Sequence, residues 1–190
     1  ETVYIDLGQV IEERLHSIDG GTTFAQTIDY TYHPRGWVKS KSSDLFAMEF
    51  YYEDAASIPG GTALYDGSIG ALDWTSPDDP DLTSTVPQRR RSYGYQYDNL
   101  GRLTEGRYRQ YLMTGALDGG TNNLYTTEGI TYDLNGNLLT LKRYGNVNGQ
   151  KHLIDDLTYH YANAHTYTWQ IGAQPADLNT NNRLVAVEDA

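Results

Sequence analysis

A recurring pattern of tyrosine and glycine constrains the fold of this chain more than any other feature of its sequence. Each copy has a Tyr, three further residues, a Gly, one more residue, and then Val or Leu. The four copies are Tyr4–Val10, Tyr32–Val38, Tyr97–Leu103 and Tyr132–Leu138. Looser relatives begin at Tyr65 and at Tyr159. Self-similarity of this kind indicates a chain built from copies of one supersecondary unit.

The glycine of each copy stands where a tight turn needs it. A type I turn favours Asp at its first position and Gly at its fourth, and Asp98 with Gly101, like Asp133 with Gly136, supplies both. A type I turn followed by a left-handed Gly is a common hairpin loop. We therefore expect tight turns at these two glycines, both at positive φ, and at Gly36. The residues that define the repeat turns are Tyr4, Gly8, Tyr32, Gly36, Tyr97, Asp98, Gly101, Arg102, Tyr132, Asp133 and Gly136.

Tyrosines two residues apart mark the strands that lead into these turns. Tyr93, Tyr95 and Tyr97 alternate with small or polar residues, and alternate residues of a strand share one face. The chain has 17 Tyr and 19 Gly but only 3 Phe. Because Tyr favours strands and Gly favours turns, we expect an all-β fold of about ten to fourteen antiparallel strands, with less than about a tenth of the residues helical.

The repeats predict a single region that spans residues 1–190. Its units are expected near residues 4–16, 30–41, 65–74, 93–108, 130–145 and 157–189. Two stretches break the pattern. Residues 75–92 contain three of the six prolines, and Pro cannot donate to a ladder, which predicts a long surface loop. Residues 162–181 are rich in Asn, Thr, Ala and Gln and predict a second long loop.

The segment Tyr97–Leu103, with the sequence Tyr-Asp-Asn-Leu-Gly-Arg-Leu, resembles the YD repeat of RHS-repeat proteins. The order of the other motifs is similar to the region that precedes the RHS-associated core in Bacteroidetes-type members. Those motifs are Gly36-Trp37, Asp44-Leu45-Phe46, the segment from Tyr65 to Trp74, and the unit at Tyr132. The resemblance covers nearly all of the chain.

This resemblance implies a curved strip of antiparallel β-hairpin repeats, one segment of a β-shell in a large secreted or cell-surface protein. In the family such a shell encloses a toxin or effector, and teneurins use a related barrel in adhesion. The implied partners are neighbouring repeats of the same polypeptide or an encapsulated cargo segment, with a glycan or the secretion machinery as alternatives.

The charge balance argues against two classes of partner. With 14 Lys and Arg against 25 Asp and Glu, the formal net charge is -11. An acidic surface repels phosphate backbones and anionic lipids, so we expect no nucleic-acid or membrane-surface partner. The sequence has no run of about 18 apolar residues, so we expect no membrane insertion. Cysteine is absent, which excludes thiol catalysis and cysteine metal sites.

The sequence offers little that indicates catalysis. Some RHS proteins cut themselves at an Asp-Pro-x-Gly motif, but Asp79-Pro80 is followed here by Asp81 and Leu82. No phosphate-binding loop or nucleophile elbow appears. We expect no enzymatic activity and no cofactor, although sequence alone leaves a pair of glycosidase carboxylates open. A weak calcium candidate is formed by Asp78, Asp79 and Asp81, with a solvated charge cluster as the alternative.

An alternative function is a carbohydrate-binding or adhesion module. Exposed aromatic rings on a sheet stack on sugar rings, and Trp37, Trp74 and Trp169 are the residues that could do so. The basic run Arg89–Arg91 precedes the strand of Tyr93. We interpret it as a charge that protects a sheet edge from stray pairing.

Overall fold

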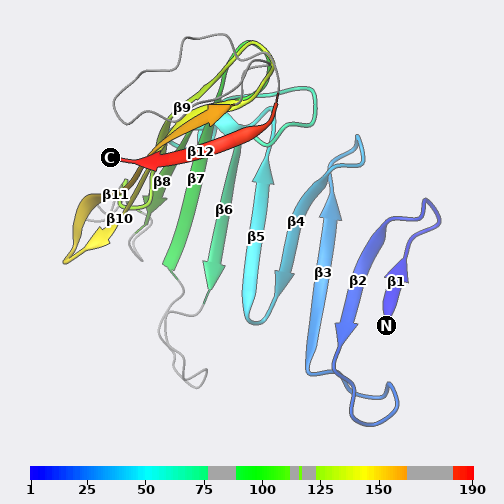
Figure 1. The fold of residues 1–190 in the computed structure, drawn as a ribbon. Coiled ribbons are helices and arrows are strands. Elements are labelled where there is room, and N and C mark those ends of the chain that lie inside the picture. Colours follow the sequence, from blue (N-terminus) through cyan, green and yellow to red (C-terminus); the bar gives the residue numbers. More distant parts are fainter. Residues whose placement is uncertain (77–88, 112–115, 117–122, 162–181) are drawn as a thin grey trace.

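The computed structural model describes residues 1–76, 89–111, 116, 123–161 and 182–190 (Figure 1). These residues form one antiparallel sheet of twelve strands, which confirms the all-β prediction. The only helix among them is one short 3-10 turn, η1 (Ala55–Ser57). The strands are β1 (Thr2–Tyr4), β2 (Val10–Leu15), β3 (Gln26–Tyr32), β4 (Val38–Ser43), β5 (Phe46–Tyr51), β6 (Ala71–Ser76), β7 (Arg89–Tyr97), β8 (Leu103–Gln110), β9 (Thr127–Tyr132), β10 (Leu138–Val147), β11 (Gln150–Tyr161) and β12 (Leu184–Asp189).

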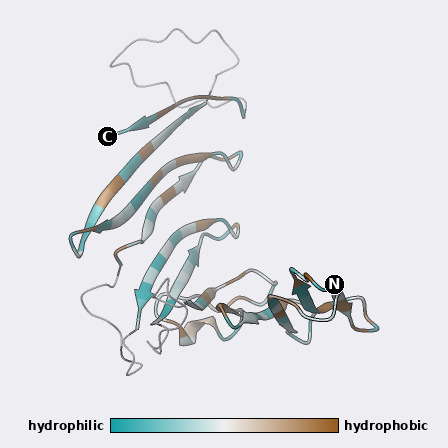
Figure 2. Ribbon diagram, turned by 90° about the horizontal axis from the view of Figure 1, so that it is seen from below, coloured by the Kyte–Doolittle hydropathy of each residue, from teal (hydrophilic) through white to brown (hydrophobic). Residues whose placement is uncertain are grey.

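The order of the strands in the sheet is the order of the strands in the chain. Every strand pairs with the one that precedes it and the one that follows it, so the sheet is a meander of six successive hairpins. Among the described residues, β1 and β12 pair on one side only. Figure 2 shows the N-terminal strands almost edge-on and the C-terminal strands rising away from them, so the strip is strongly curved.

Residues on alternate positions give the sheet two different faces. In β3, Ile28, Tyr30 and Tyr32 are buried or half-buried, whereas the residues between them are exposed. Residues paired across antiparallel strands share a face, and the register places Trp74, Tyr93, Tyr95 and Tyr108 on the side of Tyr30. We call this side the aromatic face and the other the polar face.

The rings of the aromatic face form a continuous stack. The centroids of Trp74 and Tyr93 are 5.6 Å apart, and those of Tyr93 and Tyr95 are 6.0 Å apart, with both pairs nearly parallel. Tyr108 packs edge-on against Tyr93 and is only 3% exposed. Burial of large rings in this geometry is a strong packing contribution, so this stack holds β6, β7 and β8 together.

The connection between β5 and β6 differs from the hairpin expected near residues 65–74. Residues 65–70 contain no strand, and β6 begins only at Ala71. The connection lies over the polar face, where Ala55, Ile58 and Ala71 form a buried cluster. A Cβ added at Gly94 on β7 would lie 2.3 Å from the carbonyl carbon of Gly60, so only glycine allows this close approach.

The predicted loop 75–92 is shorter in the structure. β6 extends to Ser76 and β7 begins at Arg89, because the arginine run pairs with the end of β6. The strand that carries the arginines lies between β6 and β8, so the edge-protection interpretation was wrong. Asp78, Asp79 and Asp81, Trp169 and the loop 162–181 lie outside the described residues.

Candidate functional site

The repeat turns share one hydrogen-bond pattern. In the turn of Gly101, the glycine N–H donates to the Asp98 carbonyl at 2.9 Å, and the Asp98 N–H donates to the Arg102 carbonyl at 2.9 Å. The same two bonds close the turns at Gly8, Gly36 and Gly136. The glycines have left-handed backbones, with φ of 79° at Gly8, 88° at Gly36, 74° at Gly101 and 85° at Gly136. The turn chemistry of the sequence predicts this geometry.

The aspartate of the YD motif ties its own turn together. One Asp98 carboxylate oxygen accepts the backbone N–H groups of Leu100 and Arg102, each at 2.9 Å, and the other accepts the Arg102 Nε at 2.7 Å. These bonds, led by the backbone N–H of Arg102, lower the pKa of Asp98. Asp133 makes equivalent bonds with Asn137 in the position of Arg102. The aspartate side chain therefore stabilises its own turn through hydrogen bonds.

From the second hairpin to the fifth, one tyrosine near the end of the first strand connects the hairpin to the one before it. Its phenol donates to the carbonyl of the second residue after the preceding turn glycine. These tyrosine links are Tyr32 to Val10 at 2.7 Å, Tyr52 to Val38 at 2.6 Å, Tyr97 to Ile69 at 2.6 Å and Tyr132 to Leu103 at 2.8 Å. Tyr161, the last residue of β11, occupies the corresponding position in the sixth hairpin. The links recur from the second hairpin to the fifth.

Sequence reasoning missed Tyr52, the link of the third hairpin. No glycine stands four residues after it, because the connection 52–70 separates this tyrosine from Gly67. The last unit shows the same arrangement, since a long insertion separates Tyr161 from the returning strand at Leu184. A search that allowed an insertion between tyrosine and glycine in every unit would have found Tyr52.

Side chains beside the turns also join consecutive turns along one rim of the sheet. The Gln9 amide donates to the Gly36 carbonyl at 3.3 Å, and the Arg102 guanidinium donates to the Asp133 carbonyl at 3.1 Å. The Arg102 guanidinium also lies 4.6 Å from the centroid of the Tyr132 ring. Arg102 thus connects its own turn to the next turn along the rim.

The tryptophans proposed for glycan stacking lie in separate clusters. Trp37 stacks on His33 at 5.1 Å and packs against Tyr52 at 5.0 Å, beside the β3–β4 turn. Trp74 belongs to the stack with Tyr93 on the aromatic face. Both are half-buried and pack on rings of the chain itself, so the structure does not bring them together in one platform. Glycan binding stays a prediction.

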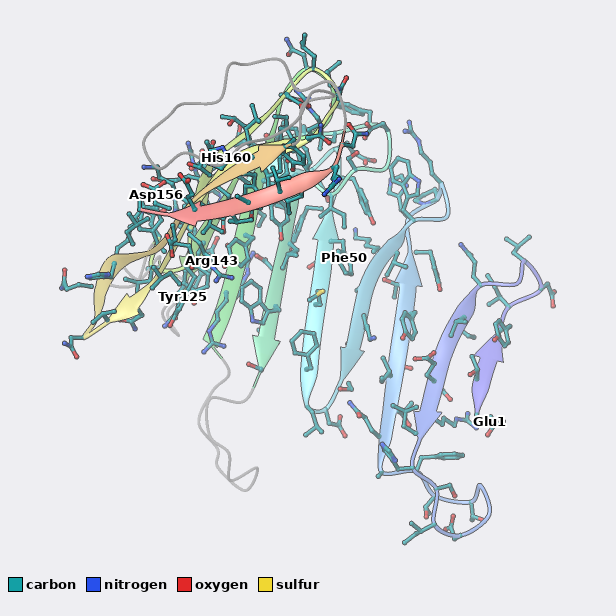
Figure 3. All side chains as sticks on the ribbon, viewed as in Figure 1. Glu1, Phe50, Tyr125, Arg143, Asp156 and His160 are labelled. Atoms are coloured by element: carbon teal, nitrogen blue, oxygen red, sulfur yellow. The ribbon has the colours of Figure 1, made fainter. Side chains whose placement is uncertain are left out.

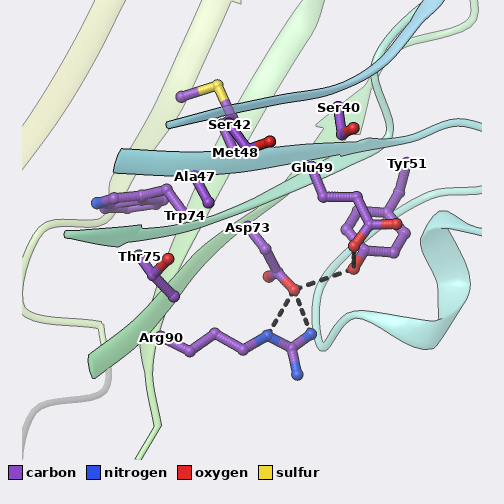
Figure 4. Close-up of a pocket in the computed structure, with 10 residues that line it drawn as sticks. All are labelled: Ser40, Ser42, Ala47, Met48, Glu49, Tyr51, Asp73, Trp74, Thr75 and Arg90. Carbon is purple, nitrogen blue, oxygen red and sulfur yellow. Dashed lines mark hydrogen bonds and ion pairs between the residues drawn. The ribbon is translucent and has the colours of Figure 1, made fainter. Parts of the chain in front are cut away.

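A pocket of about 370 Å³ lies between β4, β5, β6 and β7 on the polar face (Figure 4). Its polar lining comes from alternate positions of these strands, because cross-strand register places Ser40 opposite Glu49 and Glu49 opposite Asp73. The polar and charged side chains that line the pocket include those of Ser40, Ser42, Glu49, Tyr51, Asp73 and Arg90. No local motif marks them, since only the register of four strands brings them together.

One buried carboxylate forms the centre of this pocket. The Asp73 side chain is 8% exposed, and its Oδ2 forms an ion pair with Arg90, whose Nε lies 2.6 Å away. The Tyr51 hydroxyl lies 3.1 Å from the same oxygen and 2.9 Å from Glu49 Oε2. Burial raises the pKa of Asp73, and burial together with the two carboxylates raises the pKa of Tyr51. The other Asp73 oxygen, Oδ1, is buried without a hydrogen-bond partner among the described residues.

Comparisons with known proteins give this chain no family. No family model matches it, and no curated protein matches its sequence. Within the described part of the chain, no helix is long and apolar enough to span a membrane. The same residues contain no group of three or more His, Asp or Glu side chains that could hold a metal ion.

Proposed function

We propose that this chain is a structural repeat segment of an RHS-type β-wall, in a large secreted or cell-surface protein, that encloses or presents a toxin, effector or adhesive segment. The tyrosine links carry the proposal, because they tie the second, third, fourth and fifth hairpins to their predecessors in the same way. A repeat that uses one connection many times suits a wall of extendable length. In this proposal the chain has no catalytic role and needs no cofactor.

The first hairpin supports the idea of further repeats. Tyr4 occupies the linking position of this hairpin, but it is 58% exposed and its hydroxyl has no partner among the described residues. The corresponding tyrosines of the second to fifth hairpins all donate to a preceding unit. The exposed hydroxyl of Tyr4 is thus accessible to a neighbouring unit of a wall.

The two edge strands of the sheet also support the proposal of a larger wall. β1, near the labelled Glu1, and β12, beside the labelled His160, lie at opposite ends of the strip (Figure 3). Edge strands present unpaired backbone groups that recruit another strand. On β12, Leu184 and Val187 are 48% and 47% exposed, so this edge carries apolar side chains, and within the described part of the chain one side of β12 is unpaired.

Sedimentation velocity of the purified chain tests this proposal. We expect concentration-dependent self-association through the edges despite the charge of -11. The double variant Leu184→Glu, Val187→Glu places like charges on β12 and should shift the chain toward monomer. Val147→Glu is the matched control, because Val147 is 44% exposed but lies on the interior strand β10. A chain that stays monomeric at high concentration with both edges solvent-exposed would contradict the wall.

A further inference from the structure

In the pocket of the polar face, the hydrogen bonds around Asp73 leave one buried acceptor without a donor. Both nitrogens of Arg90 that reach Asp73 contact the same oxygen, Oδ2. The single proton of the Tyr51 hydroxyl faces two carboxylate oxygens, one from Glu49 and one from Asp73. Two carboxylates and one guanidinium leave this group of side chains with a formal charge of minus one. This group of side chains therefore leaves Asp73 Oδ1 without a donor and carries one uncompensated negative charge.

The unpartnered oxygen shows where the donor is missing. Asp73 is nine-tenths buried, and its Oδ1 has no hydrogen-bond partner among the described residues. Figure 4 shows that only one oxygen of this carboxylate carries the dashed lines to Arg90 and Tyr51, and the Asp73 side chain lines the pocket. A buried acceptor without a partner is costly, so a ligand that brings a donor gains what the chain itself leaves unsatisfied.

We propose that this pocket binds an organic cation, the alkylammonium or guanidinium group of a basic peptide side chain. Such a group carries three or five N–H donors and no acceptor, whereas every sugar hydroxyl brings an acceptor along with its donor. The cation would be held by Glu49 and Asp73, with the hydroxyls of Ser40 and Ser42 as further acceptors. Arg90 does not oppose it, because the Asp73 ion pair balances the arginine charge.

The size of the pocket and the charge of the chain agree with this ligand. About 370 Å³ lies at the lower end of ligand pockets, which suits one side chain rather than an oligosaccharide. The net charge of -11 attracts cations over longer distances. This binding site does not depend on whether the sheet forms part of a wall.

Ligand-observed saturation-transfer NMR tests the site, because it tolerates self-association of the protein. The probes are N-acetyl-lysine methylamide and N-acetyl-arginine methylamide, with N-acetyl-norleucine methylamide as an uncharged analogue and methyl glucoside as the sugar. We expect saturable binding of at least one cationic probe. Norleucine should bind about tenfold more weakly or not at all, since a charge-assisted hydrogen bond is worth about 1.5–3 kcal/mol.

Two matched variants locate the binding. Glu49→Gln keeps an acceptor for Tyr51 but removes a charge, and should weaken cation binding about tenfold. Glu105→Gln removes the same charge from β8 on the polar face, outside the pocket and beside Arg107, and should leave binding unchanged. Circular dichroism confirms that both variants fold. Equal binding of norleucine, binding of the glucoside in place of the cations, equal loss in both variants, or no saturable binding would each overturn the proposal.

Discussion

The third hairpin and the fourth hairpin of this sheet connect their two strands in different ways. The fourth, β7–β8, turns on a tight loop whose Gly101 has open space around it. The third, β5–β6, is joined by the connection 52–70, which packs closely on the polar face against Gly94. Both hairpins nevertheless make a tyrosine link to the unit before them. The link, rather than the turn, is the constant feature of the unit.

The two hairpins also differ in the kind of interaction that stabilises their connections. The tight turn is held by bonds among residues at most four apart, such as those of Asp98. The connection is held by contacts between distant segments, for example Gln96 donating to the Gly60 carbonyl at 2.7 Å. We therefore expect substitutions in the connection 52–70 and in the tight turn to lower the free energy of unfolding for different physical reasons.

The largest effect should come from Gly94→Ala. The new Cβ would lie 2.3 Å from the Gly60 backbone, which cannot move like a flexible side chain. We expect destabilisation at or above the upper end of the roughly 1–3 kcal/mol typical of overpacking, measured by urea unfolding. The control is Gly106→Ala on β8, where the nearest atom to the new Cβ is 3.5 Å away. A Gly94 variant as stable as the control would remove the close-packing argument.

Valine at a turn glycine should lower the free energy of unfolding by less than Gly94→Ala does, and for another reason. Gly101→Val and Gly136→Val meet nothing within 4 Å, but a β-branched residue resists φ of 74° or 85°. We expect a loss of about 1–3 kcal/mol at each site, again from urea unfolding. A change below measurement error at both sites would show that these turns do not need a left-handed residue.

Within the fourth hairpin, acid should act on the turn at Asp98 and base on the tyrosines of β7, with a graded effect on the free energy of unfolding. The folded-state pKa of Asp98 is lowered, so its contribution is present above its unfolded pKa and is lost as the pH falls through the lowered value. Burial raises the pKa of Tyr93 and Tyr95 to about 12. Their contribution is full below the unfolded value near 10 and is lost as the pH rises through about 12.

Thermal unfolding across pH, with tyrosine absorbance at 295 nm, measures this behaviour. Asp98→Asn should flatten the acid side of the stability profile and leave the alkaline side unchanged. Ionisation of every tyrosine near pH 10, before any unfolding, would show that the aromatic face is not buried.

The features that sequence predicted are those with a local physical cause. The turn at Gly101 depends on four consecutive residues and their φ preferences, and strand alternation around Tyr93 depends on a period of two. The run Arg89–Arg91 was misjudged because its meaning depends on the strand beside it, β6, which the sequence does not specify. The pocket was missed for the same reason, since Glu49 and Asp73 become neighbours only through cross-strand register.

Removal of a single tyrosine hydroxyl should have the smallest effect on the free energy of unfolding. This change tests the tyrosine links directly. Tyr97→Phe and Tyr132→Phe keep the ring but leave the carbonyls of Ile69 and Leu103 without their donor. Each should lower the free energy of unfolding by about 1 kcal/mol. Tyr4→Phe is the matched control, because Tyr4 holds the same repeat position without a partner among the described residues, and its unfolding should change by less than about 0.5 kcal/mol. Equal changes in all three variants, measured by urea unfolding of the purified chain, would contradict the claim that these hydroxyls join the hairpins into one wall.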